Sequence, residues 1–391
     1  MKISKVHIET AHENPCYFCG LSLVEAIFIL YNFPIAPRST KVPMHEKSEF
    51  KIGKCKNCHL IQKISKSDTK VLYEEFKNDI IGNKLSQQKT IFSKYIQAEL
   101  SKNFKVAEIG SGNGQIIKKL ANDNPESSFI ANDYNLSFKN NHKNLIKISG
   151  DLHNYKIDKI DLFFSSHVFE HIENIQEHIN YVYNSLNYGG KYLIAIPLFE
   201  EWIKNQNLNS FSQEHPIYPF EVDLDYLFES YGFKKCNSSK FLDHSLFVTY
   251  EKTNQKLQNL HYFSKSSHKS KIIHLNKFVE RLNLLKNLLL KVSKRHKKIV
   301  IWGANTSTQV LISLLDELYI SHKNLMIVDN SNLKIGGYLF GTDIKIKSPS
   351  EISNLTSEDS VIIMLGVFDD EVVEQCQKIN PDVTIYTKKD I

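Results

Sequence analysis

Two pairs of cysteines in the 391-residue chain have the spacing of a zinc site. Within each pair two residues separate the cysteines, which are Cys16, Cys19, Cys55 and Cys58. Four thiolates can close a tetrahedron around one Zn²⁺ ion, and a filled tetrahedron leaves no position open for chemistry. The pattern therefore predicts a structural zinc ion, with two unrelated redox or core pairs as the alternative. The other two cysteines, Cys236 and Cys376, are isolated, and we expect both to fill the core.

A glycine-rich segment indicates a nucleoside-binding loop. It reads Glu108-Ile-Gly110-Ser-Gly112-Asn-Gly114, follows a strand pattern and precedes a helical one. Glycines at such a place let the backbone approach a ligand closely and turn sharply into the helix. Glu108 precedes the first glycine by two residues, where its carboxylate can meet a cationic amino-acid group. A dinucleotide site is the competing interpretation, although the third glycine of G-x-G-x-x-G is missing.

Two more acidic residues follow in order. Asp133 stands 19 residues past Gly114, where a carboxylate at a strand end can accept both ribose hydroxyls. Asp151 would then reach the adenine amino group. A single aspartate at such a place is more often a turn residue. The ordered set of three acids, Glu108 included, favours S-adenosylmethionine as the cofactor.

The elements that must position these residues alternate between strand and helix. A first series has strands at 106–109, 129–131, 160–165 and 191–196, with helices at 70–100 and 115–122. After a Lys- and Leu-rich helical connector at 272–294, a second series has strands at 299–302, 325–328 and 361–365. Its helices cover 308–319 and the residues from 369 onward. Such alternation predicts two Rossmann-like units with mostly parallel sheets covered on both faces.

Composition narrows the class of protein further. The formal charge of +6 arises from 49 basic and 43 acidic residues, and so small a surplus argues against a nucleic-acid partner. The apolar stretch 21–33 contains Glu25 and ends at Pro34, so it cannot span a bilayer. Polar residues rather than an apolar leader follow Met1, and we expect a cytoplasmic protein without a membrane partner. Thiols stay reduced in that compartment, which again favours zinc over disulfides.

Together these residues resemble the three-domain sugar C-methyltransferase-like family. The resemblance is carried by the cysteine pairs, Ser166-His-Val-Phe-Glu-His171-Ile, Gln213-Glu-His-Pro-Ile-Tyr-Pro-Phe220, and the stretches 329–338 and 341–344. It implies an α/β fold with a class I methyltransferase Rossmann-like sheet, a small N-terminal zinc module and a second, C-terminal Rossmann-like α/β domain. The implied divisions are a zinc-binding module at 1–75, a methyltransferase domain at 76–255, a helical connector at 256–298 and the C-terminal domain at 299–391.

The resemblance also implies a reaction, which is methyl transfer from S-adenosylmethionine to carbon of a nucleotide-linked keto sugar. A base removes a proton next to the carbonyl group, and the resulting enolate attacks the sulfonium methyl group. A neutral imidazole suits this step because its pKa lies near the working pH. By resemblance, His215 is the base, Glu214 its orienting or charge-stabilising partner, and His171 a second polar group at the sugar.

Several alternatives stay open at this point. Ser212 stands where sugar enzymes of the family often have tyrosine, and O-methylation of a sugar or another small molecule is the main rival. An RNA base methyltransferase with a zinc module would need a basic, aromatic-rich face. An NAD-dependent sugar-nucleotide enzyme would bind NAD in place of S-adenosylmethionine. The segment Gly303-Ala-Asn-Thr lacks a glycine-rich phosphate loop. His167, His171 and His178 could instead be satisfied histidines of one helix face.

Overall fold

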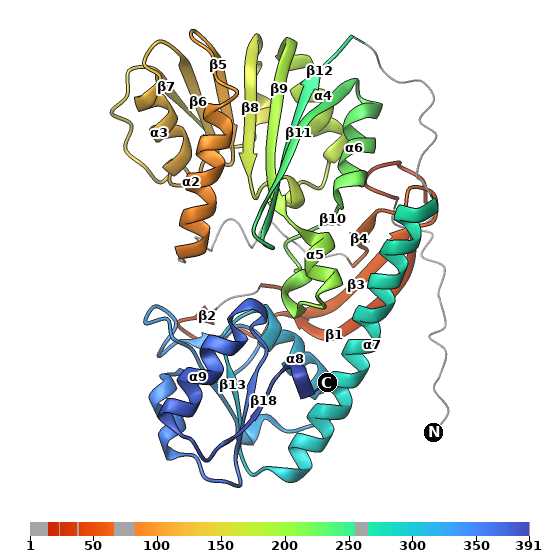
Figure 1. Cartoon of the computed structure of the whole chain (residues 1–391), viewed down its shortest axis with the longest axis vertical. Coiled ribbons are helices and arrows are strands. Elements are labelled where there is room, and N and C mark those ends of the chain that lie inside the picture. Colours follow the sequence, from red (N-terminus) through yellow and green to blue (C-terminus); the bar gives the residue numbers. More distant parts are fainter. Residues whose placement is uncertain (1–14, 23, 37–38, 66–82, 255–264, 391) are drawn as a thin grey trace.

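A computed structural model of the chain describes residues 15–22, 24–36, 39–65, 83–254 and 265–390. Their strands form a seven-stranded, a five-stranded, a four-stranded and a two-stranded sheet. The four-stranded sheet lies between the seven-stranded sheet and the C-terminal five-stranded sheet (Figure 1). The first part of the helix predicted at 70–100 lies outside the described residues, as do the expected domain boundaries after residues 75 and 255.

The seven-stranded sheet has the strand order β11-β12-β9-β8-β5-β6-β7. β5, β6, β7, β8 and β9 pair in parallel with one another, whereas β12 is antiparallel to both β9 and β11. One reversed strand inserted beside the last parallel strand is the arrangement of class I methyltransferases, so the predicted fold class is confirmed. The strands are β5 (Lys105–Ile109), β6 (Ser128–Asp133), β7 (Leu145–Ser149), β8 (Ile160–Ser166), β9 (Leu186–Pro197), β11 (Phe233–Phe241) and β12 (Ser245–Lys252).

Helices cover both faces of this sheet because successive strand residues point to opposite sides. In β5, Val106 belongs to the core beneath α2 and α3, whereas Ala107 belongs to the core beneath α4 and α6. The amphipathic α3 begins directly at the glycine loop and buries Ile116, Ile117 and Leu120. The helices are α2 (Asn83–Gln97), α3 (Gln115–Asp123), α4 (Ile175–Ser185) and α6 (Glu221–Ser230).

The four-stranded sheet joins the N-terminal cysteine region to the middle of the chain. Its order is β1-β3-β4-β10, all antiparallel, and the strands are β1 (Val24–Pro34), β3 (Lys47–Cys55), β4 (Ile61–Lys63) and β10 (Ile217–Tyr218). The apolar stretch 21–33 therefore supplies a β-strand. Among the described residues, no helix has the length and apolar character needed to cross a membrane.

The C-terminal part begins with the long helix α7 (Lys265–Arg295) and continues as a parallel five-stranded sheet of order β16-β14-β13-β17-β18. Helix α8 packs against β1, and one core cluster contains apolar residues of β1, α7 and α8. The N-terminal sheet thus shares a core with the C-terminal unit. The elements are β13 (Ile299–Trp302), α8 (Thr306–Glu317), β14 (Leu325–Val328), β16 (Ile346–Lys347), β17 (Ser360–Ile363), α9 (Asp369–Ile379) and β18 (Thr384–Tyr386).

Two smaller elements link these parts. The short helix α5 (Phe199–Lys204) follows β9 and contacts α7. A two-stranded ribbon pairs β2 (Ser39–Thr40) with β15 (Tyr338–Leu339), so the N-terminal and C-terminal parts also meet through backbone hydrogen bonds.

Candidate active site and zinc site

The two cysteine pairs form matching knuckles. In the first, the backbone N–H of Gly20 donates to the carbonyl of Cys16 over 2.8 Å, and in the second, His59 donates to Cys55 over 3.0 Å. Both residues that follow the second cysteine have positive φ angles, 72° for Gly20 and 57° for His59. This left-handed conformation is strained for any residue except glycine. The backbone around both cysteine pairs therefore adopts the same loop conformation.

The four sulfur atoms converge. The Sγ atoms of Cys16 and Cys58 lie 3.3 Å apart and those of Cys19 and Cys55 3.6 Å apart, and all four lie within 4.8 Å of one another. Zn–S bonds of about 2.3 Å would place tetrahedral sulfurs about 3.8 Å apart. The donor set and its spacing therefore fit a zinc ion. Of the remaining cysteines, Cys376 is buried as expected, but Cys236 is exposed on the edge strand β11 and is not core filler.

The glycine loop connects β5 to α3 through three left-handed residues. Gly110, Gly112 and Gly114 have φ angles of 76°, 50° and 71°. A Cβ atom on Gly110 would lie 2.2 Å from Cγ2 of Val168, and one on Gly114 would lie 2.6 Å from the Phe138 ring. A Cβ on Gly112 would meet no protein atom within 4 Å. The loop is thus packed at its two ends and open at its centre, where a ligand could approach the backbone.

Replacing Gly110 by alanine is expected to weaken cofactor binding and to destabilise the protein. The new methyl group needs both a left-handed backbone, costing about 1–2 kcal/mol, and displacement of the stiff, β-branched Val168. Gly189→Ala is the matched control, because Gly189 has a similar φ of 73° with no atom near its Cβ position. Thermal unfolding and calorimetric titration with S-adenosylmethionine should show the larger loss for Gly110→Ala. Equal losses would mean that the contact with Val168 is unimportant.

Two of the three predicted acids lie directly at this loop. Glu108 is only 3% exposed, and its Oε2 atom has no hydrogen-bond partner among the described residues. Removal from water raises the pKa of this carboxyl group to about 8. Asp133, at the end of β6, accepts a hydrogen bond from the backbone N–H of Gly112 over 2.8 Å. A buried carboxylate oxygen without a partner beside an open glycine loop fits the cationic amino group of S-adenosylmethionine.

Asp151 follows β7 at the same edge of the sheet. It caps a short 3-10 helix, Leu152–Asn154, and its Oδ1 accepts from the backbone N–H of His153 over 3.0 Å. The Nδ1 atom of the same histidine lies 2.6 Å from Oδ1. Asp151 therefore has a structural partner of its own, and its contact with adenine stays a prediction.

The structure brings His171 and His215 together. His171 ends a 3-10 helix, Phe169–His171, that follows β8, and His215 lies on the loop leading into β10. Their ring centroids are 4.6 Å apart, and the rings meet edge to face. The Nδ1 atom of His171 lies 3.1 Å from the backbone carbonyl oxygen of Glu214, which places the N–H of His171 on Nδ1.

Glu170, to which the sequence pattern assigned no role, lies next to both histidines. One carboxylate oxygen of Glu170 lies within 4.8 Å of a ring nitrogen of His171 and of His215. Its Oε1 atom is also 3.3 Å from Nδ1 of His167. Glu170 is completely buried, but the surrounding histidines hold its pKa below the usual value despite the opposing effect of burial. A fixed negative charge therefore lies beneath the imidazole pair.

His215 itself is uncharged at neutral pH. Loss of contact with water and the neighbouring His171 lower its pKa to about 3, and the negative charge of Glu170 opposes this. The residue remains partly exposed, whereas its Nδ1 atom is buried and has no partner among the described residues. This pKa lies below the near-neutral value expected from the sequence, so His215 of the ligand-free protein is neutral but only weakly basic.

The backbone carbonyl oxygen of Glu214 contacts His171, and the charge of the Glu214 side chain affects Lys63 of β4. Burial lowers the pKa of Lys63 to about 8, while the charges of Glu173 and Glu214 partly offset this effect. The Nζ atom of Lys63 donates to the carbonyl oxygen of Gln213 over 2.7 Å, and its backbone N–H donates to Pro216 over 2.9 Å. Lys63, on a strand next to the cysteine knuckles, thus holds the His215 loop (residues 213–216) at both ends, Gln213 and Pro216.

Other residues of the site lie differently from expectation. His167, His171 and His178 do not share one helix, because His167 lies in the loop after β8 and only His178 belongs to α4. Tyr218 is a core residue, since it is fully buried and its hydroxyl group donates to the carbonyl oxygen of Ser212 over 2.6 Å. That contact fixes the segment just before His215.

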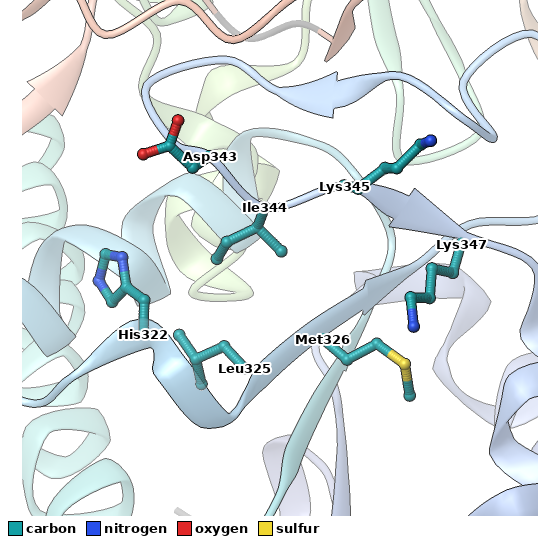
Figure 2. A pocket seen from close by; sticks show the side chains of 7 residues that line it. All are labelled: His322, Leu325, Met326, Asp343, Ile344, Lys345 and Lys347. Carbon is teal, nitrogen blue, oxygen red and sulfur yellow. The ribbon is translucent and has the colours of Figure 1, made fainter.

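A separate cavity of about 330 Å³ opens on the C-terminal sheet (Figure 2). It lies beside β14 and β16, and its walls include none of the candidate cofactor, catalytic or zinc-binding residues. Its one histidine, His322, is already paired with Asp316, whose Oδ1 atom is 2.7 Å from Nε2. We assign no chemistry to this cavity, whose lining residues are His322, Leu325, Met326, Asp343, Ile344, Lys345 and Lys347.

Comparison with known families matches two parts of the chain. Residues 107–194 match the family described as "Methyltransferase domain", and residues 248–384 match "C-methyltransferase C-terminal domain". The second match begins within β12 and includes α7 as well as the C-terminal sheet. Comparison with curated protein sequences gave no significant match.

Solved structures similar to the chain include methyltransferases. An S-adenosylmethionine-dependent methyltransferase from Mesorhizobium loti is 13% identical, with 41% of this chain and 96% of that chain covered and a TM-score of 0.35. Human N-acetylserotonin methyltransferase is 15% identical, with 44% of this chain and 54% of that chain covered and a TM-score of 0.36. The sheet order, the glycine loop with its acids and the family matches together define the chain as an S-adenosylmethionine-dependent methyltransferase.

Proposed function

We propose that this methyltransferase transfers the methyl group to a carbon atom of a nucleotide-linked keto sugar. The observation that carries the proposal is His215, a neutral and partly exposed imidazole next to the buried negative charge of Glu170. A base of this kind is needed to remove a proton from carbon but is not required for every methyl transfer. The match of residues 248–384 to a C-methyltransferase C-terminal domain supports the same chemistry.

In the proposed reaction His215 removes the proton next to the carbonyl group. The electron pair left on carbon forms the new C–C bond to the methyl group, and the C–S bond of the cofactor breaks. Glu170 stabilises the imidazolium that forms, because its charge favours protonated His215. His171, fixed through its Nδ1 atom, would offer Nε2 to a sugar hydroxyl, and Glu214 would orient the loop.

The cofactor assignments complete the proposal. Glu108 would bind the amino group of S-adenosylmethionine, the backbone of Gly110, Gly112 and Gly114 would face its amino-acid and ribose parts, Asp133 would bind the ribose, and Asp151 would bind the adenine. The four cysteines would hold one structural Zn²⁺ ion, which supplies folding energy and no chemistry of its own.

The proposal is tested by identifying the product. The protein is incubated with S-adenosylmethionine carrying a ¹³C-methyl group and with a panel of nucleotide-linked 4-keto-6-deoxy sugars. NMR correlation then shows whether the labelled methyl carbon is attached to carbon or to oxygen. We expect a methyl group on the carbon next to the keto group. Label found only on a sugar oxygen would establish O-methylation instead, the alternative that Ser212 in place of tyrosine leaves open.

Binding of S-adenosylmethionine is expected to release a proton at pH 7. The ligand-free carboxyl group of Glu108, with its pKa near 8, is mostly protonated at that pH, and a bound ammonium group would favour the charged form. Affinity should therefore rise with pH and level off above about 8. The same raised pKa makes the ligand-free protein less stable as pH rises from 4.5 to about 8, because only the folded state keeps the proton.

Calorimetry in two buffers of different ionisation enthalpy measures this proton release. Glu108→Gln should bind more weakly and release no proton. A wild-type binding enthalpy that does not depend on the buffer would show that Glu108 does not bind the amino group.

A further inference from the structure

A row of polar side chains leads from the His215 site toward the surface; its outer members are hydrogen-bonded, whereas neither carboxylate oxygen of Glu170 has a hydrogen-bond partner among the described residues. From Glu170 the row passes to His167, whose Nδ1 atom is 3.3 Å from Oε1 of Glu170. The Nε2 atom of His167 lies 3.0 Å from Oγ of Ser245, and that oxygen lies 2.7 Å from Nδ1 of His244. The four residues come from the segment after β8 and from the hairpin turn between β11 and β12.

The row begins at a completely buried group and ends at a partly exposed one. Glu170 and Ser245 are completely buried, the side chain of His167 is 21% exposed, and His244 is partly exposed in the hairpin turn. Leu242, two residues before His244 in the hairpin turn, is 60% exposed. The row therefore connects the buried side of the His215 site to a place that water reaches.

His167 has a left-handed backbone conformation, and its ring nitrogens lie next to Glu170 and Ser245. Its φ angle is 55°, in the left-handed region that costs a non-glycine residue about 1–2 kcal/mol. A hydrogen bond of 2.7 Å from its N–H to the carbonyl oxygen of Ala195 holds it there. An imidazole between a carboxylate and a hydroxyl group can take up a proton at one nitrogen and release one from the other.

We propose that Glu170, His167, Ser245 and His244 form a relay that carries the proton taken up by His215 to solvent. This inference rests on the proposed function, in which each turnover transfers one proton from sugar carbon to His215. The substrate covers the exposed side of His215 during the reaction, so the proton leaves from the buried side, where Nδ1 lies. Glu170 is within 4.8 Å of a ring nitrogen of His215, a gap that one water molecule spans with two hydrogen bonds of about 2.8 Å.

Each transfer along the relay conserves charge and atoms. His215 gives its proton to the carboxylate of Glu170, which returns to the ionised form by giving a proton to Nδ1 of His167. His167 releases the proton on Nε2 to Ser245, whose hydroxyl group passes its own proton to Nδ1 of His244. His244 then loses a proton to water or buffer, and the tautomer of His167 and the orientation of the Ser245 hydroxyl group reverse before the next turnover. No oxidant or further reactant is needed.

Deuterium exchange tests the relay separately from methyl transfer. The protein is mixed with S-adenosylhomocysteine, which has no methyl group to give, and a nucleotide-linked 4-keto-6-deoxy sugar in D₂O. His215 then removes and returns the proton next to the keto group, and NMR follows the entry of deuterium at that carbon. We expect Ser245→Ala and His244→Ala to slow deuterium entry by about 10²-fold, the lower end of the range for a lost proton-transfer group. Single-turnover methyl transfer from S-adenosylmethionine should stay at the wild-type rate.

Two comparisons exclude a merely structural effect. Ser239→Ala changes an exposed serine of the same hairpin and should leave deuterium entry unchanged. Added imidazole should restore deuterium entry in His244→Ala but not in Ser245→Ala, because a small base can replace the outermost group only. Wild-type exchange rates in both relay variants would overturn the relay. If the wild-type protein neither exchanges the proton nor methylates any sugar of the panel, the proposed function fails instead.

Discussion

Replacement of His215 by alanine is expected to reduce methyl transfer by about 10²–10⁴-fold, the usual contribution of a positioned general base. Affinity for S-adenosylmethionine should stay unchanged, because His215 lies on the loop before β10 and the proposed cofactor groups follow β5, β6 and β7. The two quantities are measured as single-turnover methyl transfer and by calorimetric titration. The loss should appear in the rate at saturating substrate, since the base acts on the bound sugar.

His322→Ala is the matched control for this experiment. His322 is also a partly exposed histidine beside a carboxylate, Asp316, but it lies in the C-terminal cavity far along the chain from the His215 loop. The control should retain the wild-type rate and affinity. An unchanged rate in His215→Ala would remove His215 from the reaction and with it the argument for carbon as the acceptor.

Loss of the zinc site is expected to have the second large effect. In Cys55→Ser combined with Cys58→Ser, one of the two knuckles loses both thiolates, and bound zinc should fall from about one ion per chain to none. The melting temperature should fall by on the order of 10 °C, because structural zinc contributes several kcal/mol to folding. Elemental analysis and thermal unfolding measure the two quantities.

The loss should extend to the loop that carries His215. Lys63 lies only a few residues after Cys58, and it holds the His215 loop through Gln213 and Pro216. Fluorine NMR of a label near that loop, or protection of its amides from hydrogen exchange, should therefore change in the double variant. Cys236→Ser is the control, because that cysteine is exposed on β11. Wild-type protein purified without zinc would contradict the assignment.

Sequence patterns predicted the central strands of the seven-stranded sheet better than its edge strands. β5 and β8 are mostly buried and carry apolar residues on both faces, as central strands covered by helices do, and their patterns predict strands. The edge strands β7 and β11 were not predicted, because β7 exposes Ile146 and β11 is mostly polar and exposed. The buried strand β12 was missed as well, since nothing in its local pattern shows that it returns between β9 and β11.

The candidate site was only partly predictable for a similar reason. The glycine loop and its acids are close in sequence and keep their order around one sheet edge. Glu170 was quoted within a motif but given no role, since burial of a carboxylate depends on tertiary contacts that a single sequence does not display. The one available signal was that Glu170 directly precedes His171 in the sequence. Lys63 could not be foreseen, because its partner Gln213 is 150 residues away.

The pairing of β4 with β10 has a consequence for how the protein acquires its shape during synthesis. The ribosome makes the cysteine knuckles and β1, β3 and β4 long before it makes β10, so β4 has no partner on its outer side until β10 has been made. Pairing β10 with β4 joins segments far apart in the chain, and non-local contacts of this kind form slowly. The nascent chain is thus exposed to aggregation until its catalytic loop is in place, and a chaperone would be most useful to it in that interval.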